Sequence, residues 1–186
     1  NGTTCDNNTA VGKSAMENIT SGSKNVAVGT NALDAATTAD DNTAVGYEAL
    51  GANTSGTDNV AVGQAALDAN TEGDLNTAVG SFALSTATTA DNNTGIGYSA
   101  LFLLTTGNNN TAVGRASGQS ITTAVQNTLV GAESGDAITT GGNNTFVGYE
   151  CGGSLTTGGD NVAMGRAAFL DNSTGSACVA IGVEAS

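Results

Sequence analysis

Asp and Glu are the main residues in this chain whose side chains could act in catalysis or bind a metal ion. The chain has 17 Asp and Glu residues and no histidine. Without histidine, Ser-His-Asp triads and the common zinc sites are excluded. Carboxylate pairs on neighbouring loops, such as Asp40 and Asp58, lie in polar segments, and solvated carboxylates suit general acid–base chemistry poorly. We therefore expect no enzymatic activity and assign no catalytic residue.

Calcium is the metal that these carboxylates suit best, because Ca²⁺ binds Asp, Asn and backbone carbonyl oxygens. The candidate ligands precede or neighbour asparagines and are Asp40, Asp41, Asp58 and Asp91. The glycine- and aspartate-rich nine-residue pattern of calcium-binding β-rolls is absent. A polar turn is thus the simpler alternative, and we expect no other cofactor.

Asparagines in N-x-Thr or N-x-Ser sequons form a second set of candidate sites. Besides Asn1, the candidate acceptors for N-glycosylation are Asn7, Asn18, Asn53, Asn92, Asn109, Asn143 and Asn172. A repeat rich in Asn and Thr also generates such sequons by chance. Where a glycosylation pathway exists, the loop asparagines would be accessible acceptors.

All these residues recur because the chain is built on a 17-residue repeat, a feature to be sought before any other. A pentapeptide such as NTAVG or NVAVG starts at residues 8, 25, 42, 59, 76, 93, 110, 127, 144 and 161, and CVAIG starts at 178. No insertion or deletion interrupts this register. We number the coil positions from this first Asn, so that position 5 is always Gly.

The repeat predicts an all-β fold, a parallel β-solenoid of eleven coils in a single domain, 1–186, with a partial coil at 1–7. Thr3 and Thr4 would fill positions 13 and 14 of that partial coil. The β-branched residues of positions 1 to 4 favour a strand. Positions 6 to 9, such as residues 47–50, predict a second strand, and positions 10 to 17 a return loop rich in turn residues. No segment has the periodicity of a substantial helix.

Alternation along the first strand predicts which residues form the core. Positions 2 and 4 share one face, and position 3 points to the other. We expect positions 2 and 4 to face the core, so that Val45→Asp or Val79→Asp would collapse the rod. Position 3, which includes Leu129 and Phe146, would then face outward, where a homo-oligomer could cover it.

Stacked coils place like residues above one another at about 4.8 Å. The position-1 asparagines should form a hydrogen-bonded amide ladder. Threonines at positions 13 and 14 form a second array, for which an ice-binding face and a hydrogen-bonded loop are the two interpretations. Because consecutive residues face opposite ways, the loop is the simpler of the two.

Three cysteines, Cys5, Cys151 and Cys178, fall at different coil positions. Cys5 and Cys151 would lie roughly 40 Å apart at the strand spacing, so we expect no intrachain disulfide. Cys151 should fill a small core slot. The odd count leaves an interchain bond through Cys5 or Cys178 open.

The net charge of −13 indicates a soluble surface that repels nucleic acid and anionic membranes. The chain has no apolar run long enough to span a membrane. It starts without a signal segment, so we interpret it as a processed or excised piece of a longer rod.

The motif N-(T/V)-A-V-G-x-x-A-L, clearest at residues 42–50 and 59–67, resembles the head repeat of YadA-like trimeric autotransporter adhesins. Similar repeats occur in phage tail fibres. The resemblance spans nearly the whole chain and implies a left-handed β-roll, assembly as a trimer, and a surface glycan or host receptor as ligand. This chain differs in its longer, Thr-rich loop and in having no coiled-coil stalk or membrane anchor.

These features together predict a structural or adhesive fibre module that is extracellular, on a cell surface or a virion. Two alternatives stay open. One is a self-assembling filament subunit that stacks through its open end coils. The other is a solenoid that binds glycan or ice.

Overall fold

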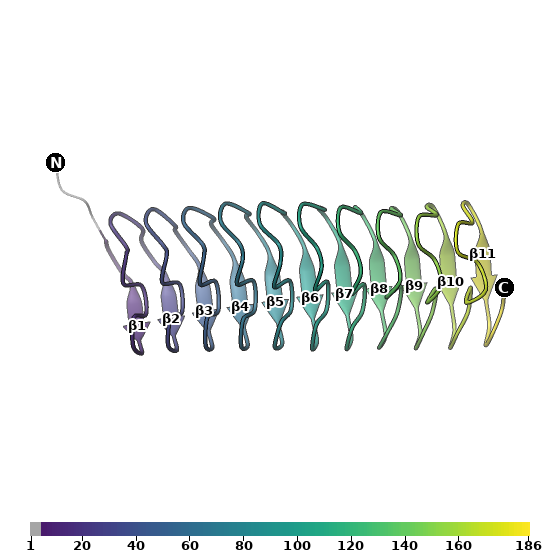
Figure 1. Cartoon of the computed structure of the whole chain (residues 1–186), viewed down its shortest axis with the longest axis horizontal. Coiled ribbons are helices and arrows are strands. Elements are labelled where there is room, and N and C mark those ends of the chain that lie inside the picture. Colours follow the sequence, from purple (N-terminus) through teal and green to yellow (C-terminus); the bar gives the residue numbers. More distant parts are fainter. Residues whose placement is uncertain (1–4) are drawn as a thin grey trace.

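The computed structural model describes residues 5–186 as an all-β parallel solenoid (Figure 1). The expectations for Asn1, Thr3 and Thr4 lie outside the described residues. Within residues 5–186, eleven three-residue strands form one sheet in chain order. The strands are β1 Thr9–Val11, β2 Val26–Val28, β3 Thr43–Val45, β4 Val60–Val62, β5 Thr77–Val79, β6 Thr94–Ile96, β7 Thr111–Val113, β8 Thr128–Val130, β9 Thr145–Val147, β10 Val162–Met164 and β11 Val179–Ile181.

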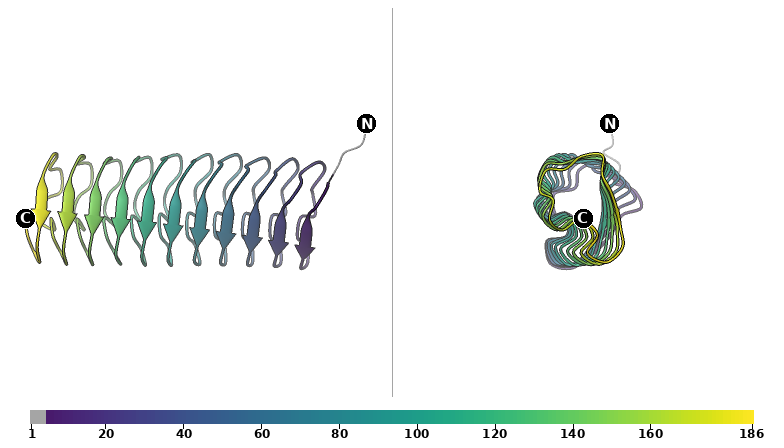
Figure 2. Two further views of the ribbon diagram at one scale, coloured as in Figure 1. Left: turned by 180° about the vertical axis from the view of Figure 1, so that it is seen from behind. Right: turned by 90° about the vertical axis from the view of Figure 1, so that its right-hand side faces the viewer.

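Neighbouring strands pair in parallel with a constant offset of one 17-residue repeat. Thr43 pairs with Val60, and Val45 pairs with Val62. The coils therefore stack into a rod with the first and last coils at opposite ends, and the end-on view shows each coil shifted slightly from the one before it (Figure 2). This confirms the predicted parallel solenoid with its 17-residue spacing, and the described residues contain no helix.

Glycine at position 5 ends each strand because the backbone there requires it. Gly46 has a φ of 140°, a conformation that side chains disfavour. A Cβ on Gly46 would also overlap the backbone carbonyl of Gly63 in the next coil. The same close approach recurs along the rod, which explains why every coil has glycine at this position.

The segment after this glycine is a turn, so the predicted second strand at positions 6 to 9 is wrong. In residues 47–50, Glu48 and Leu50 have φ values of 56° and 51°. A left-handed backbone costs a non-glycine residue about 1–2 kcal/mol. Full burial of the Leu50 side chain contributes about 1.5–3 kcal/mol, which is enough to offset that cost.

The predicted facing of the strands is also wrong. The middle strand residues, at position 3, are the buried ones: Ala44, Leu129 and Phe146 are all 0 % exposed. Val45 and Val79 at position 4 remain half-buried on the outside of the solenoid. Alternation fixes which residues share a face, but it does not say which face is inside. The narrow interior decides this, because most coils have room only for Ala at position 3.

Side-chain volumes inside the rod compensate one another. Five coils combine a small residue at position 3 with Leu at position 9, as in Ala44 and Leu50. Where position 9 is glycine, larger residues fill the space. A Cβ on Gly152 would overlap the Phe146 ring, and a Cβ on Gly135 would crowd the Leu129 side chain. Interiors are packed densely, so Leu129 and Phe146 are core residues and no longer point to an outer interface.

An asparagine ladder runs along the rod and confirms the predicted amide stack. The Asn25 Oδ1 accepts hydrogen bonds from the Asn42 backbone N–H at 2.9 Å and from the Asn42 Nδ2 at 3.2 Å. The Asn42 Nδ2 also donates to the Gly56 carbonyl at 2.8 Å. Each asparagine therefore joins its own coil to the preceding one, and it satisfies backbone groups that would otherwise be buried without partners.

Two further ladders support the return loop. The Thr54 Oγ1 donates to the Thr71 carbonyl of the next coil at 2.9 Å, and other position-13 residues do the same. At position 16, the Asp91 carboxylate accepts the backbone N–H of Asp74 at 2.8 Å. The position-13 threonines thus belong to a hydrogen-bonded loop, as the simpler interpretation predicts, while threonines at position 14 are exposed.

Candidate functional site

The broadest candidate site is the outward face of the sheet, which we call the outer sheet face. It consists of the first and third residues of strands β1 to β11, and each of these is Thr, Val, Ile or Met. Val62, Ile96 and Val130 keep 37 %, 39 % and 38 % of their surface exposed. The parallel register places these residues in two straight rows along the rod.

The outer sheet face contains no ionisable residue, although the whole chain has a net charge of −13. Outward strand positions on a solvated sheet usually carry polar and charged residues. Large exposed patches of apolar residues in soluble proteins mark sites of interaction. The composition of this face therefore makes it a candidate interaction surface.

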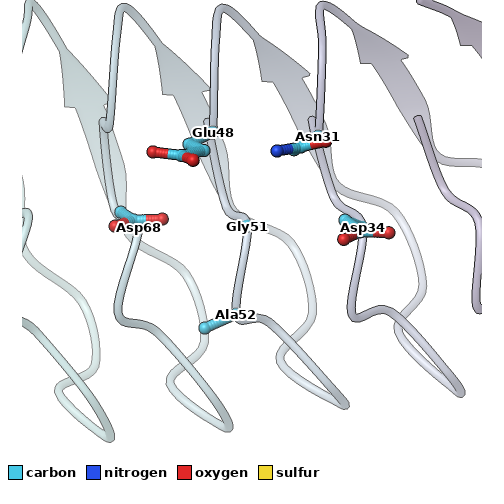
Figure 3. A pocket seen from close by; sticks show the side chains of 6 residues that line it. All are labelled: Asn31, Asp34, Glu48, Gly51, Ala52 and Asp68. Carbon is cyan, nitrogen blue, oxygen red and sulfur yellow. The ribbon is translucent and has the colours of Figure 1, made fainter. Parts of the chain in front are cut away.

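A second candidate site is a shallow hollow on the turns of the second to fourth coils. It has a volume of about 320 Å³ and is lined by Asn31, Asp34, Glu48, Gly51, Ala52 and Asp68. The close-up shows carboxylates from three successive coils around it (Figure 3). Such a hollow could attract a cationic group, but its acids come from a surface that is acidic almost everywhere.

Partial burial, nearby carboxylates and hydrogen bonds raise the pKa of several acidic and phenolic side chains on these turns. Partial burial, and then the nearby Glu48 carboxylate, raise the pKa of Asp68. Partial burial and Glu133 raise the pKa of Asp136 in the same way. The exposed Tyr149 hydroxyl donates to the Glu150 carboxylate at 2.7 Å, and this hydrogen bond is the main cause that raises the pKa of Tyr149 to about 12.

The calcium candidates do not converge on one site. Asp40 accepts a backbone N–H from Ser23 at 2.6 Å, and Asp91 holds the equivalent ladder position three coils on. Asp41 lies 3.4 Å from the Lys24 ammonium group, and Asp58 is exposed on a turn. Within residues 5–186, no three His, Cys, Asp or Glu side chains form a group that could hold a metal ion. The role of position 16 as a backbone acceptor was missed, although the Asp, Asn and Ser residues that recur there could have suggested it.

Some sequon asparagines are exposed at corners of the coil, and others form hydrogen bonds within the folded chain. Asn92, Asn109 and Asn143, like Asn7, are exposed at corners with positive φ. Asn53, in contrast, is fully buried and its Nδ2 donates to the Gly56 carbonyl at 3.0 Å. The folded chain therefore does not offer Asn53 as an acceptor.

Asn18 is exposed and Asn172 is partly buried, but both side chains form hydrogen bonds. The Asn18 Nδ2 donates to the Asp34 carbonyl at 3.0 Å, and the Asn172 Oδ1 accepts the Gly175 N–H at 2.6 Å. Both side chains already have partners in the folded chain. The corner asparagines at position 17 are thus the sequon residues that the fold leaves most accessible.

The three cysteines are free and lie in different environments. Cys151 is buried and fills a small core slot, as expected, and burial raises the pKa of its thiol. Cys178 stands where the ten preceding coils carry the ladder asparagine, and its backbone N–H donates to the Asn161 Oδ1 at 3.0 Å. Through this backbone N–H, Cys178 makes the last hydrogen bond of the asparagine ladder within the described residues.

No family model, curated protein or solved structure matches this chain. The resemblance to adhesin heads and tail fibres therefore stays an expectation. Among residues 5–186, no helical segment has the length and hydropathy of a membrane crossing. The described residues form a regular rod with an uncharged outer sheet face and an acidic hollow. Any function proposed for the chain has to rest on these three features.

Proposed function

We propose that this chain is a structural module of an extracellular fibre, in which repeated coils provide stiffness and reach. The observation that carries the proposal is the unbroken connection of every coil to the next. Within residues 8–178, the strands, the position-1 asparagines and the loop threonines all form hydrogen bonds from one coil to the next. A mechanical role needs this continuity and does not need a reaction centre.

Bonding in three places around the coil makes bending unfavourable. The sheet ladder runs along one side, the asparagine ladder lies where the strand begins, and the Thr ladder runs along the return loop. Bending the rod in any direction would stretch at least one of these ladders. A solenoid in which each repeat contacts only its neighbours is quasi-one-dimensional, so its length follows the number of coils.

The adhesive part of this proposal rests on the sequence resemblance, and so do a surface location, a glycan or host receptor as ligand, the left hand and a trimer. The acidic hollow of the second to fourth coils is a further surface on which an adhesin could contact a ligand. The corner sequons offer sites for modification if the chain is secreted in a cell that glycosylates.

In-register duplication of coils tests the mechanical role directly. Residues 42–126, five whole repeats, would be inserted again after residue 126. The longest dimension measured by small-angle X-ray scattering should grow by about 24 Å, from five strand spacings, with no change in cross-section. A control insertion of a Gly/Ser-rich segment of equal length should add a flexible chain instead. Growth in cross-section rather than length would contradict the fibre role.

A further inference from the structure

We propose that the outer sheet face is an interface between copies of this chain, so that rods associate side by side through the outward residues of β1 to β11. This inference names the partner of the rod. It rests on the composition and geometry of the face rather than on the fibre role, so the duplication experiment can fail without affecting it.

The distribution of charge identifies this face as the place where two copies can meet. Acidic residues occupy the turns and loop corners, including Glu48, Asp58, Asp68 and Asp160. Three of the four cationic residues already pair with carboxylates in ion pairs. Two acidic rods repel each other when these surfaces approach. Contact through the outer sheet face keeps the acidic surfaces apart and brings only uncharged side chains together.

The repeat makes a second copy a better occupant than an unrelated partner. Each rod presents two rows of side chains at the strand spacing, with Val, Ile or Met in one row and Thr or Val in the other. A second copy has the same rows at the same period, so its side chains can interlock along the whole length. A partner without this period would match the face at only a few coils.

The size of the face is compatible with a specific interface. Ten strand spacings of about 4.8 Å and a width of roughly 10 Å give a face of roughly 500 Å² on each copy. Two copies would bury about 1,000 Å² in total, which is the size at which specific interfaces begin. Association should therefore be concentration-dependent and should strengthen as coils are added.

The mass of the chain in solution, measured by sedimentation equilibrium under reducing conditions, tests this proposal. Reduction removes disulfide dimers through Cys5 or Cys178. The wild-type chain should show a multiple of its 18.0 kDa mass at high concentration and a lower mass on dilution. A single-chain mass at every concentration would overturn the proposal.

Matched lysine variants show whether the outer sheet face is responsible. Ile96→Lys with Val130→Lys places two cations on the face, whereas Thr106→Lys with Thr140→Lys places two on exposed loop positions of the same coils. Both double variants change the net charge equally, and both reduce the overall repulsion. The face variant should raise the dissociation constant by at least about tenfold, while the loop variant should not. Equal effects of the two variants would overturn the proposal.

A milder pair of substitutions covers the outcome in which lysine prevents folding. Ile96→Thr and Val130→Thr keep β-branched side chains in the strands and remove only apolar surface. They should weaken association without altering the circular dichroism spectrum, and unchanged association would count against the interface. If the wild-type chain is monomeric at every concentration and shows thermal hysteresis, the outer sheet face binds ice and not a second copy.

Discussion

Asn93 ties three successive coils together through one side chain. Its Oδ1 accepts the Asn110 backbone N–H at 2.9 Å, and its Nδ2 donates to the Gly107 carbonyl at 2.9 Å and the Asp91 carbonyl at 3.0 Å. Its own backbone N–H donates to the Asn76 Oδ1 at 3.0 Å. The side chain is fully buried. A sequence pattern predicts this ladder because one polar residue type recurs at a fixed position beside apolar neighbours.

Asn93→Ala should lower the free energy of unfolding by about 2–3 kcal/mol, because a buried donor and buried acceptors lose their partner. Urea denaturation followed by circular dichroism measures this. Thr106→Ala removes an exposed side chain from the same coil and should change stability by less than about 0.5 kcal/mol. Equal losses for both variants would show that the ladder adds little to stability.

Asp68 should make stability depend on pH in the opposite sense to an ion-paired carboxylate. Its pKa in the folded chain is raised above the ordinary 3.8, so the folded state binds the proton more tightly than the unfolded state does. The charged form therefore destabilises the fold at neutral pH, and this penalty disappears as the pH falls through the raised pKa towards 3.8.

Asp68→Asn should accordingly raise the melting temperature at pH 7, and its advantage over the wild-type chain should vanish below pH 3.8. Melting curves across this range measure the difference. Asp58→Asn is the control, because Asp58 is an exposed corner carboxylate at a position where other coils carry Asn. A constant advantage of Asp68→Asn at every pH would contradict a charge effect.

At the scale of the element, each coil combines one strand with a chain of turns. The strand was predictable from NTAVG, because β-branched residues and a following glycine specify it. The turn after it was not, because Leu50 and Glu48 occupy left-handed conformations that their residue types do not signal. The facing of the strand was not predictable either, because Ala44 and Val45 are both compatible with burial and only the width of the coil selects the smaller.

The volume exchange between Phe146 and Gly152 can be measured as a coupling energy. Phe146→Ala should cost about 3–5 kcal/mol through the cavity that it leaves. Gly152→Leu should also destabilise, because its side chain would overlap the Phe146 ring. The double variant restores the Ala and Leu pair of other coils, so it should be more stable than the sum of the single losses implies, by about 2 kcal/mol. Additive losses in denaturant titrations would show that the two positions do not share space.

At the scale of the whole molecule, the sequence specifies a rod because no coil differs in length from 17 residues. The solenoid class and its 17-residue spacing were therefore predictable. The outer sheet face was not, because assigning it depends on which side of the strand is inside. Because Leu129 and Phe146 lie in the core, the uncharged outer surface is formed by their neighbours, and the net charge of −13 is a property of the other sides of the rod.

The middle residue of each strand faces the core, and its two neighbours face outward. Ala78 is 0 % exposed, and the adjacent Val79 is half-buried on the outer sheet face. Far-UV circular dichroism and thermal melting of Ala78→Asp and Val79→Asp, compared in dilute solution, test this directly. Ala78→Asp should lose the folded signal because it buries an unpaired carboxylate, whereas Val79→Asp should keep it. A folded Ala78→Asp chain together with a collapsed Val79→Asp chain would contradict this orientation of the strands.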